Sequence, residues 1–514
     1  MPLPLFFRAR PLTLVVISVF VAAPVWAVGG ADKIDTTAMA EHADAWHEAQ
    51  KPVNGNPVWQ FNRYTTNLSR VIVAADNWQA SRPLFCQFGK GETAMNISAD
   101  SYIRLSHHTT VWGSAGYATG KRRQIKWNST ADFALLYPYV MADTLGGNLT
   151  FERYAFTAGW ASAWKKVKLG ADMDFRAEHE YRTTDPRPRN IVTDLTMRFG
   201  VSMPLSSLYE LGLTGACRFY KQTNEVKFYR EAGVIPEYHM LGLGMDYKRF
   251  SGSNASTYYK GTGYEAGIDL TPIGRYGLMA SAGYAYSPYH RILPNLNALP
   301  ISVLGVQRVK GELGWKENRN AGGWMLKVSA DYERRTGNEQ IAGSSSSGEY
   351  RIVDELTTYR AHSARYVLTA IYNHHARQTV WNASLSTGYS DYAARYVFPE
   401  RRLSFDKAFV EARGQWQRLL PRRHLLSADV AAAYYASVSS SMQMPYATMS
   451  DANARLMEQT MASLSAGYFL AQARLRWIIP LRRNAFFVEL GGRFLANDDS
   501  FHSWSQHLAI GFTF

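Results

Sequence analysis

The sequence has little cysteine and no long apolar run after its first residues. Its 514 residues include two cysteines, Cys86 and Cys217, which are too few for a disulfide framework and leave open either one bridge or two separate thiols. No apolar run long enough for a membrane helix follows residue 27, which argues against an inner-membrane protein. The sequence also lacks a phosphate loop, a paired-cysteine zinc site and a Gly-flanked nucleophilic serine. We therefore expect no metal site and no cofactor.

The first residues have the three parts of a secretory signal peptide. Arg8 and Arg10 precede an apolar run over residues 12–23, and Ala27 ends a short cleavage region. The apolar run is shorter than the roughly 20 residues that a bilayer helix needs. We therefore expect residues 1–27 to be a signal peptide that is removed on export.

The chain is basic, with 56 Lys and Arg against 42 Asp and Glu and a formal net charge of +14. A basic domain often binds nucleic acid, but here the cations are scattered along the chain rather than gathered on one helix. We therefore expect no nucleic-acid partner. An anion-rich surface or an anion-favouring interior explains the charge better.

The strongest pattern in the sequence is strict alternation of apolar and charged residues. Because successive side chains of a strand point to opposite faces, such a segment has one face suited to lipid and one suited to water. Residues 166–182 alternate in this way, as do residues 309–316, 324–335 and 408–417. Several of these segments exceed the strands of most soluble sheets, which have about five or six residues. Together with 13% aromatic residues, they predict an all-β fold, a transmembrane antiparallel β-barrel with aromatic girdles.

Turn residues predict how the strands are connected. Short connections that contain proline occur at residues 203–207, 271–275, 420–423 and 479–483, and longer polar stretches alternate with them. Since outer-membrane barrels have short periplasmic turns and long extracellular loops, the proline-containing connections are predicted to be periplasmic. The pattern gives about 16–18 strands, the first three beginning near residues 92, 108 and 124 and the last near residue 503.

Residues 28–91 precede the predicted barrel, which covers residues 92–514. Residues 36–50 are rich in Ala and Glu and predict a helix, and residues 68–75 predict a short strand. A segment of this length can plug the lumen or lie in the periplasm, and the sequence leaves both alternatives open.

A set of charged residues falls on the predicted inward face of the strands. They either set the ion selectivity of a pore or form a cross-strand network that stiffens a closed lumen, and the mixture of signs on each strand leaves both roles open. The set is Lys168, Asp172, Asp174, Arg176, Glu178, Glu180, Lys327, Asp331, Glu333, Arg335, Glu411, Arg413, Arg474, Arg476, Glu489 and Arg493.

One cluster suggests catalysis. Asp498, Asp499 and His502 lie in the last predicted extracellular loop, and His107 and His108 lie in the first, so closure of the barrel would make them neighbours at the outer rim. Outer-membrane proteases of the omptin type activate water with Asp and His at such a rim. Polar loop tips contain these residues without any activity, however. We expect the protein not to be an enzyme, and keep a rim-catalysis enzyme as an alternative.

The order of these features resembles an uncharacterised family of outer-membrane β-barrel proteins from Gram-negative bacteria. The likeness rests on the signal peptide, on residues 59–62 (Trp-Gln-Phe-Asn), on residues 83–85 (Pro-Leu-Phe) and on the strands that continue to the terminal Phe. The resemblance implies the fold and a location in the cell outer membrane. It carries over no functional residue.

Residues 504–514 are predicted to be the closing strand of the barrel, paired with residues 92–105, and residues 508–514 alternate and end in an aromatic residue. Phe512 and Phe514 are predicted to face lipid and to serve as the signal read by the barrel assembly machinery, the expected partner during biogenesis. The other expected partners are outer-membrane lipid and a small-molecule solute. The sequence therefore predicts a porin-like channel or transporter for small solutes. A structural or adhesive surface protein that displays residues 223–256 and 439–459 is the alternative from another class.

Overall fold

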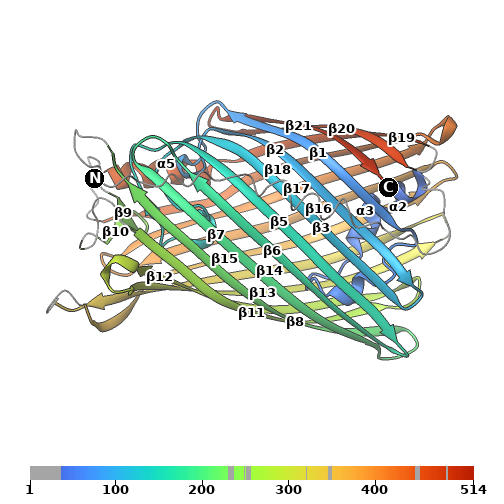
Figure 1. The fold of residues 1–514 in the computed structure, drawn as a ribbon, viewed down its shortest axis with the longest axis horizontal. Helices are drawn as coiled ribbons and strands as arrows, with labels where there is room; N and C mark the ends of the chain where they lie inside the picture. Colours follow the sequence, from blue (N-terminus) through green and yellow to red (C-terminus); the bar gives the residue numbers. More distant parts are fainter. Residues whose placement is uncertain are drawn as a thin grey trace, which may run out of the picture.

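The computed structural model describes residues 36–229, 237–247, 249, 256–319, 321–344, 350–445, 452–481 and 484–514. In these residues eighteen strands form one closed sheet in which each strand is antiparallel to its neighbours. The sheet is a barrel whose strands are tilted against its long axis (Figure 1). The predicted all-β transmembrane barrel is confirmed. The signal peptide predicted at residues 1–27 lies outside the described residues.

The strands follow one another around the wall in chain order, and β1 and β21 complete the circle. Their bounds are β1 (Leu68–Ala80), β2 (Gly91–Ser106), β3 (Thr109–Ile125), β5 (Gly147–Trp164), β6 (Val167–Tyr181), β7 (Arg187–Pro204), β8 (Tyr209–Lys227), β11 (Ser256–Pro272), β12 (Tyr276–Leu293), β13 (Leu299–Arg319), β14 (Gly322–Ala342), β15 (Ile352–His375), β16 (Thr379–Tyr396), β17 (Arg401–Leu419), β18 (Leu425–Gln443), β19 (Tyr468–Pro480), β20 (Ala485–Asn497) and β21 (His502–Thr513).

The alternation of the sequence sets which side of each strand faces out. In β6, Leu169 and Met173 are 43% and 40% exposed on the outer surface, whereas Glu178 and Glu180 on the opposite face are 3% and 1% exposed. Apolar side chains on the outside of a closed sheet form the surface that hydrocarbon covers. Among the described residues, no helix is long and apolar enough to cross a membrane.

The last strand alternates as predicted. Phe512 and Phe514 are exposed on the outer surface, while Ala509 and Thr513 on the other face are buried. The role of the two phenylalanines as an assembly signal stays a prediction.

The barrel closes on a strand that the sequence did not assign to the wall. β1 pairs with β2 on one side and with β21 on the other, so the wall begins at Leu68 and not near residue 92. The predicted closing pair of residues 92–105 with the last strand is therefore wrong. Ile72 of β1 packs against a buried cluster that contains Met39 of helix α2 (Thr36–His42). The short strand predicted at residues 68–75 is confirmed as part of β1. The contact with α2 makes the middle of β1 apolar on both faces, so the alternation that marks a wall strand is lost.

A strand predicted to begin near residue 124 is absent from the described chain. β3 runs to Ile125, and Gln124 and Trp127 have left-handed backbone, each with a φ of 56°, where the strand ends. Residues 126–146 then fold back into the barrel as a short helix, α4 (Phe133–Leu136), and a short strand, β4 (Met141–Ala142). The number of strands lies in the predicted range because β1 takes the place of this strand.

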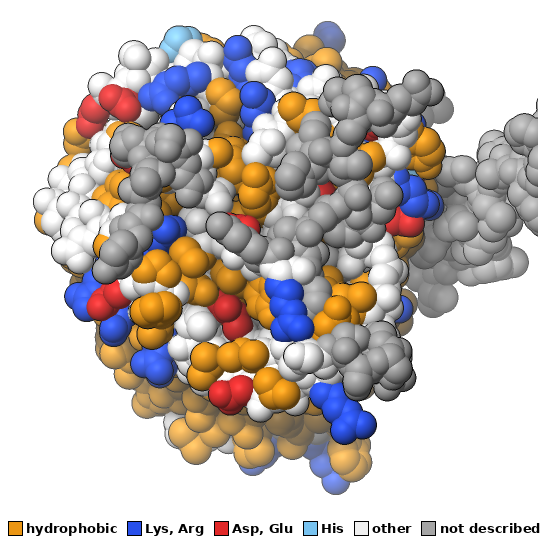
Figure 2. All heavy atoms as spheres, turned by 90° about the vertical axis from the view of Figure 1, so that its left-hand side faces the viewer, with side chains coloured by type: hydrophobic (Ala, Val, Ile, Leu, Met, Phe, Trp, Pro, Cys, Tyr) orange, Lys and Arg blue, Asp and Glu red, His pale blue; other side chains and the backbone are white. Residues whose placement is uncertain are grey.

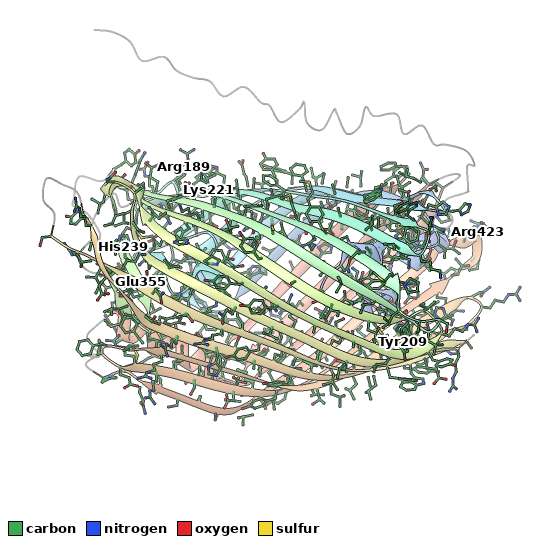
Figure 3. All side chains as sticks on the ribbon, turned by 90° about the horizontal axis from the view of Figure 1, so that it is seen from below. Arg189, Tyr209, Lys221, His239, Glu355 and Arg423 are labelled. Carbon is green, nitrogen blue, oxygen red and sulfur yellow. The ribbon has the colours of Figure 1, made fainter. Side chains whose placement is uncertain are left out.

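Short connections lie at one end of the barrel and longer ones at the other. Residues 205–208, 273–275 and 420–424 belong to the short set, as the prolines predicted. At the opposite end the strands reach further than expected into the polar stretches, because β8, β12 and β14 continue to Lys227, Leu293 and Ala342. We call the two ends the turn end and the loop end. Figure 3 shows Tyr209 and Arg423 at the turn end, and Arg189, Lys221 and Glu355 toward the loop end.

Two groups of segments lie inside the wall, one toward each end (Figure 1). Residues 36–67 form what we call the inner plug, toward the turn end, with helices α2, α3 (Ala45–Ala49) and η1 (Pro57–Gln60). The outer plug, toward the loop end, consists of residues 126–146, residues 237–247 and helix α5 (Ala452–Ser465). In it, β9 (Tyr238–Gly242) pairs with β4 on one side and with β10 (Met245–Asp246) on the other, as a separate small sheet. The other short helices are η2 (Cys86–Phe88), η4 (Pro294–Leu296) and η5 (Pro421–Arg423).

Candidate functional site

Inward-facing glycines on neighbouring strands leave room for the inner plug. A Cβ atom on Gly200 would lie 1.9 Å from Oδ1 of Asn56, and one on Gly267 would lie 2.5 Å from Cγ of Asn54. Side chains at these positions would therefore displace the plug. We call the full set the glycine floor: Gly170, Gly200, Gly212, Gly267 and Gly283, on β6, β7, β8, β11 and β12.

Hydrogen bonds hold the inner plug on this side of the wall. Asn54 donates to a carboxylate oxygen of Asp269 at 2.8 Å and to the backbone carbonyls of Ile268 and Ala282. Nε1 of Trp59 donates to the other oxygen of Asp269 at 3.1 Å. Because Asp269 is buried, these donors supply the partners that its carboxylate needs.

The helices of the inner plug contact the opposite side of the wall. Asn382 of β16 donates to Oδ1 of Asp44 at 2.8 Å, and Gln415 of β17 donates to the backbone carbonyl of Ala43 at 2.8 Å. The sequence left open whether this part of the chain lies in the lumen or in the periplasm. In the structure, residues 36–67 cross the lumen from one wall to the other.

A buried apolar cluster joins the outer plug to the wall. Leu136, Tyr139, Leu241 and Met457 come from three separate segments of the plug and belong to this cluster together with inward-facing tyrosines of the strands. Arg335 of β14 donates to backbone carbonyls of residues 134, 135 and 137. Figure 2, which faces the loop end, shows hydrophobic side chains within the mouth beside the grey atoms. The outer plug thus occupies the loop end of the lumen.

Four polar groups are buried together between the outer plug and the wall. Arg182 and Asp143 form an ion pair at 2.8 Å with no exposed side-chain surface, and Oγ of Ser129 lies 3.2 Å from Oε2 of Glu237. Burial, reinforced by the nearby Asp143 carboxylate, raises the pKa of Glu237 to about 8. Glu237 therefore keeps its proton at neutral pH.

This carboxyl group should make the outer plug less stable as the pH rises. Between the ordinary pKa of 4.5 and about 8, the folded protein holds a proton on Glu237 that the unfolded segment releases. The free energy of unfolding then falls by up to about 1.4 kcal/mol per pH unit. We expect amide hydrogen exchange in residues 126–146, corrected for its intrinsic pH dependence, to be slower at pH 5 than at pH 8. E237Q should lose this dependence, and an unchanged pH profile in E237Q would contradict the assignment.

The predicted inward charges on β6 are paired across the strands. Glu178 lies 3.0 Å from Nε of Arg153, 3.0 Å from Nη1 of Arg176 and 3.4 Å from Nη2 of Arg122, and its side chain is 2% exposed. Arg176 also binds Asp132 of the outer plug at 2.6 Å. The other cross-strand pairs are Lys168 with Glu210, Asp172 and Asp174 with Arg198, Glu180 with Arg122, Lys327 with Glu312, and Asp331 with Arg308, while Glu333 pairs with Arg335 on its own strand. On this part of the wall the charges neutralise one another.

The remaining predicted charges, on β17, β19 and β20, lie at or beside a cavity. The cavity has a volume of about 860 Å³ and lies between helices α2 and α3 and the inward faces of the strands from β16 to β21 and β1. Its arginines are Arg70, Arg413, Arg474, Arg476 and Arg493, and its carboxylates are Glu48, Asp76 and Asp429. We call this space the arginine chamber.

The wall neutralises the chamber arginines incompletely. Glu489 pairs with Arg476 at 2.5 Å and with Arg474 at 3.2 Å, and Arg413 pairs with Glu411 on its own strand. Nevertheless, the side chains of Arg413 and Arg474 are 63% and 54% exposed. Arg493 is exposed as well and forms no ion pair within the described residues. The chamber therefore offers guanidinium donors to an anion.

The residues of the predicted rim-catalysis cluster do not come together. His107 and His108 form the turn between β2 and β3 at the turn end, whereas residues 498–502 lie at the loop end. Asp499 pairs with Arg82 at 3.5 Å. Across the described part of the chain, no group of three or more His, Cys, Asp or Glu residues is placed to hold a metal ion. Cys86 and Cys217 are both free thiols, so they do not form the bridge that the sequence left open.

Sequence reasoning missed the glycine floor and part of the chamber. The floor glycines stand at inward positions of strands whose other inward residues are mostly polar, and residues 52–57 ahead of the barrel are rich in Asn and Pro. Considered together, these two signals could have indicated a backbone segment lying on the wall. Arg70 and Asp76 were missed because β1 was not assigned to the barrel.

Comparison with known proteins gives a family and distant structural likenesses. A model of a family of unknown function (DUF6850) matches residues 57–514. No curated protein matches the chain. Solved structures that align with it include the ferric yersiniabactin uptake receptor FyuA from Yersinia pestis (10% identity, 87% of this chain and 80% of that chain, TM-score 0.40), the siderophore receptor PiuA from Acinetobacter baumannii (8%, 88% and 82%, 0.38) and the FrpB iron transporter from Neisseria meningitidis (7%, 89% and 82%, 0.36). At these TM-scores the likenesses carry no argument about function.

Proposed function

The chain belongs to the family of unknown function DUF6850, and we propose that it is an outer-membrane transporter for small solutes that carry a negative charge. The observation that carries this proposal is the arginine chamber, in which exposed guanidinium groups surround about 860 Å³ of space inside the lumen. Guanidinium groups bind carboxylates and phosphates through paired, charge-assisted hydrogen bonds. A chamber of this kind suits an anionic solute better than a neutral or cationic one.

The plugs favour a gated transporter over an open porin. The inner plug crosses the lumen toward the turn end and the outer plug occupies the loop end, so a solute passes the chamber when these segments move. The inner plug is the better candidate for the moving part. Besides two small apolar clusters around Met39 and Trp46, hydrogen bonds hold it over the glycine floor, whereas the outer plug shares a much larger apolar cluster with the wall. Helices α2 and α3 also form one side of the chamber.

The outward surface supports a location in the outer membrane, because closed barrels with an apolar exterior span that membrane. In this orientation the turn end faces the periplasm. Phe514 is exposed at that end, which suits the proposed contact with the barrel assembly machinery.

The alternatives have less support. A structural or adhesive protein would display residues 223–256 and 439–459. Residues 237–247 lie in the first stretch and α5 begins in the second, and both are part of the outer plug inside the wall. The rim-catalysis enzyme has less support because its His and Asp residues lie at opposite ends of the barrel.

Uptake of three sugars of similar size into proteoliposomes would test the proposal. We expect glucuronate to enter roughly tenfold faster than glucose or glucosamine, because the exposed guanidinium groups of the chamber bind its carboxylate. R413Q/R474Q/R493Q should remove most of this preference, whereas R319Q/R377Q/R418Q, which removes the same charge at the turn end, should retain it. Equal rates for the three sugars in the native protein would contradict an anion transporter.

A further inference from the structure

Three arginines stand side by side on the outward face of the wall near the loop end. Arg360 of β15 is the cross-strand partner of Arg395 of β16, and Arg395 is the partner of Arg402 of β17. We call these residues the arginine row. Like charges directly opposite each other destabilise a sheet, so the row requires a source of negative charge.

The protein supplies part of that negative charge. Glu400 pairs with Arg395 at 3.1 Å and also with Arg402, yet these two arginine side chains remain 50% and 57% exposed. Arg360 forms no ion pair within the described residues, and neither does Arg334 on the neighbouring strand β14, although both are exposed. Of the four guanidinium groups, two therefore share the carboxylate of Glu400 and two have no carboxylate partner among the described residues.

A groove of about 580 Å³ follows the arginine row and is lined by all four arginines and His362. His362 lies 3.5 Å from the carboxylate of Asp391. Closer to the middle of the barrel, Tyr366 and Tyr389 are cross-strand partners and are exposed on the same outward face. Exposed tyrosines mark the boundary between hydrocarbon and lipid headgroups. The groove therefore lies at the level of the headgroups on the loop-end side.

A second row of the same kind lies elsewhere on the wall. Lys260 of β11 is the cross-strand partner of Lys221 of β8 and of His290 of β12. Figure 3 shows Lys221 and Arg189 toward the loop end, and Figure 2 shows Lys and Arg side chains at several places around the rim. Outward positive charge is thus repeated at this level of the barrel.

We propose that the arginine row binds the phosphate groups of a phosphorylated lipid in the outer leaflet. Guanidinium groups bind phosphate in a bidentate manner, and basic residues at headgroup level attract anionic lipids. Arg360 and Arg334 supply charge that the protein leaves unneutralised, and the tyrosines below them contact the acyl chains. The position at headgroup level favours a lipid over a soluble acidic protein. This inference does not depend on the transport activity.

Lipid binding can be measured by native mass spectrometry on the full chain in detergent. The probes are a glycolipid with two phosphates on a disaccharide headgroup, the same lipid without phosphates, and inorganic phosphate. We expect the native protein to bind the phosphorylated lipid roughly tenfold more tightly than the dephosphorylated one. R360Q/R395Q/R402Q should lose this difference, R360K/R395K/R402K should keep part of it, and R319Q/R377Q/R418Q, with the same charge change at the turn end, should keep all of it.

Three results would overturn the proposal. Equal binding of both lipids by the native protein would show that only the acyl chains are bound. Unchanged preference in R360Q/R395Q/R402Q would place the phosphate site elsewhere. Binding of inorganic phosphate as tightly as the phosphorylated lipid would indicate a soluble anion site. Heat-modifiable migration in gels confirms that each variant is folded, and we expect folding to be retained because the substitutions are exposed and reduce repulsion.

Discussion

Displacing the inner plug from the wall is expected to raise the uptake of glucuronate into proteoliposomes by roughly tenfold or more, because movement of the plug limits the transport rate. The variant is G170V/G200V/G267V, which places side chains on the glycine floor. A Cβ atom alone would lie 1.9 Å from Asn56 at Gly200 and 2.5 Å from Asn54 at Gly267. These atoms would clash with the plug and displace it. The strands themselves tolerate valine, which is favoured in β-sheets.

Two comparisons make this experiment decisive. G311V adds the same side chain at a position where no atom lies within 4 Å, and its uptake should equal that of the native protein. In P57C/G170C, made in a C86S/C217S background, the Cβ atoms are 3.2 Å apart, close to the separation in a disulfide. Oxidation should lock the plug and stop uptake. Reduction should raise uptake above the native level, because a Cβ atom on residue 170 would lie 2.9 Å from the backbone nitrogen of Val58. Uptake unaffected by both the valines and the lock would contradict a moving inner plug.

Replacing Glu178 by Ala is expected to lower the free energy of unfolding by about 3–5 kcal/mol, the usual cost of breaking a buried ion pair. Arg122, Arg153 and Arg176 all bind this carboxylate, whose side chain is 2% exposed. Without it, three neighbouring positive charges repel one another on the lumen wall. Because Arg176 also holds Asp132, the outer plug should loosen at the same time.

The measurement is urea unfolding followed by tryptophan fluorescence in lipid vesicles. E411A is the matched control, since Glu411 pairs with Arg413, whose side chain is 63% exposed. An exposed pair contributes about 0–1 kcal/mol, so E411A should change stability little. Equal destabilisation by E178A and E411A would show that burial of the network does not matter.

Periodicity predicted the wall well because each wall residue meets one of two uniform surroundings, lipid or water. β6 shows this, with Leu169 outside and Glu178 inside. The prediction failed where a third environment was present. Residues 68–75 were predicted as a strand but were not placed in the wall, because Ile72 packs on a plug helix and the charged face of a wall strand is lost there. Residues 126–146 were taken for wall because nothing local shows that they fold inward.

The candidate site could be predicted only in part, because strand parity shows which charges face inward but not what surrounds them. The inward charges could be identified from strand parity, but their roles differ with their neighbours across the lumen. Glu178 lies among three arginines and the outer plug, whereas Arg493 faces an open chamber. Such differences depend on contacts between residues far apart in the chain. The alternation along a single strand does not predict these contacts.

Met39 connects the two strands between which the barrel closes. β1 and β21 meet at the junction where the circle of strands is completed, and β21 is synthesised last. Met39 packs against Leu68 of β1 and Phe487 of β20, the two strands that flank β21. Helix α2 can therefore bring together the two edges between which β21 inserts. The segment that occupies the lumen of the finished protein would then act earlier as an internal template for closing the wall, and it would be enclosed by the same step.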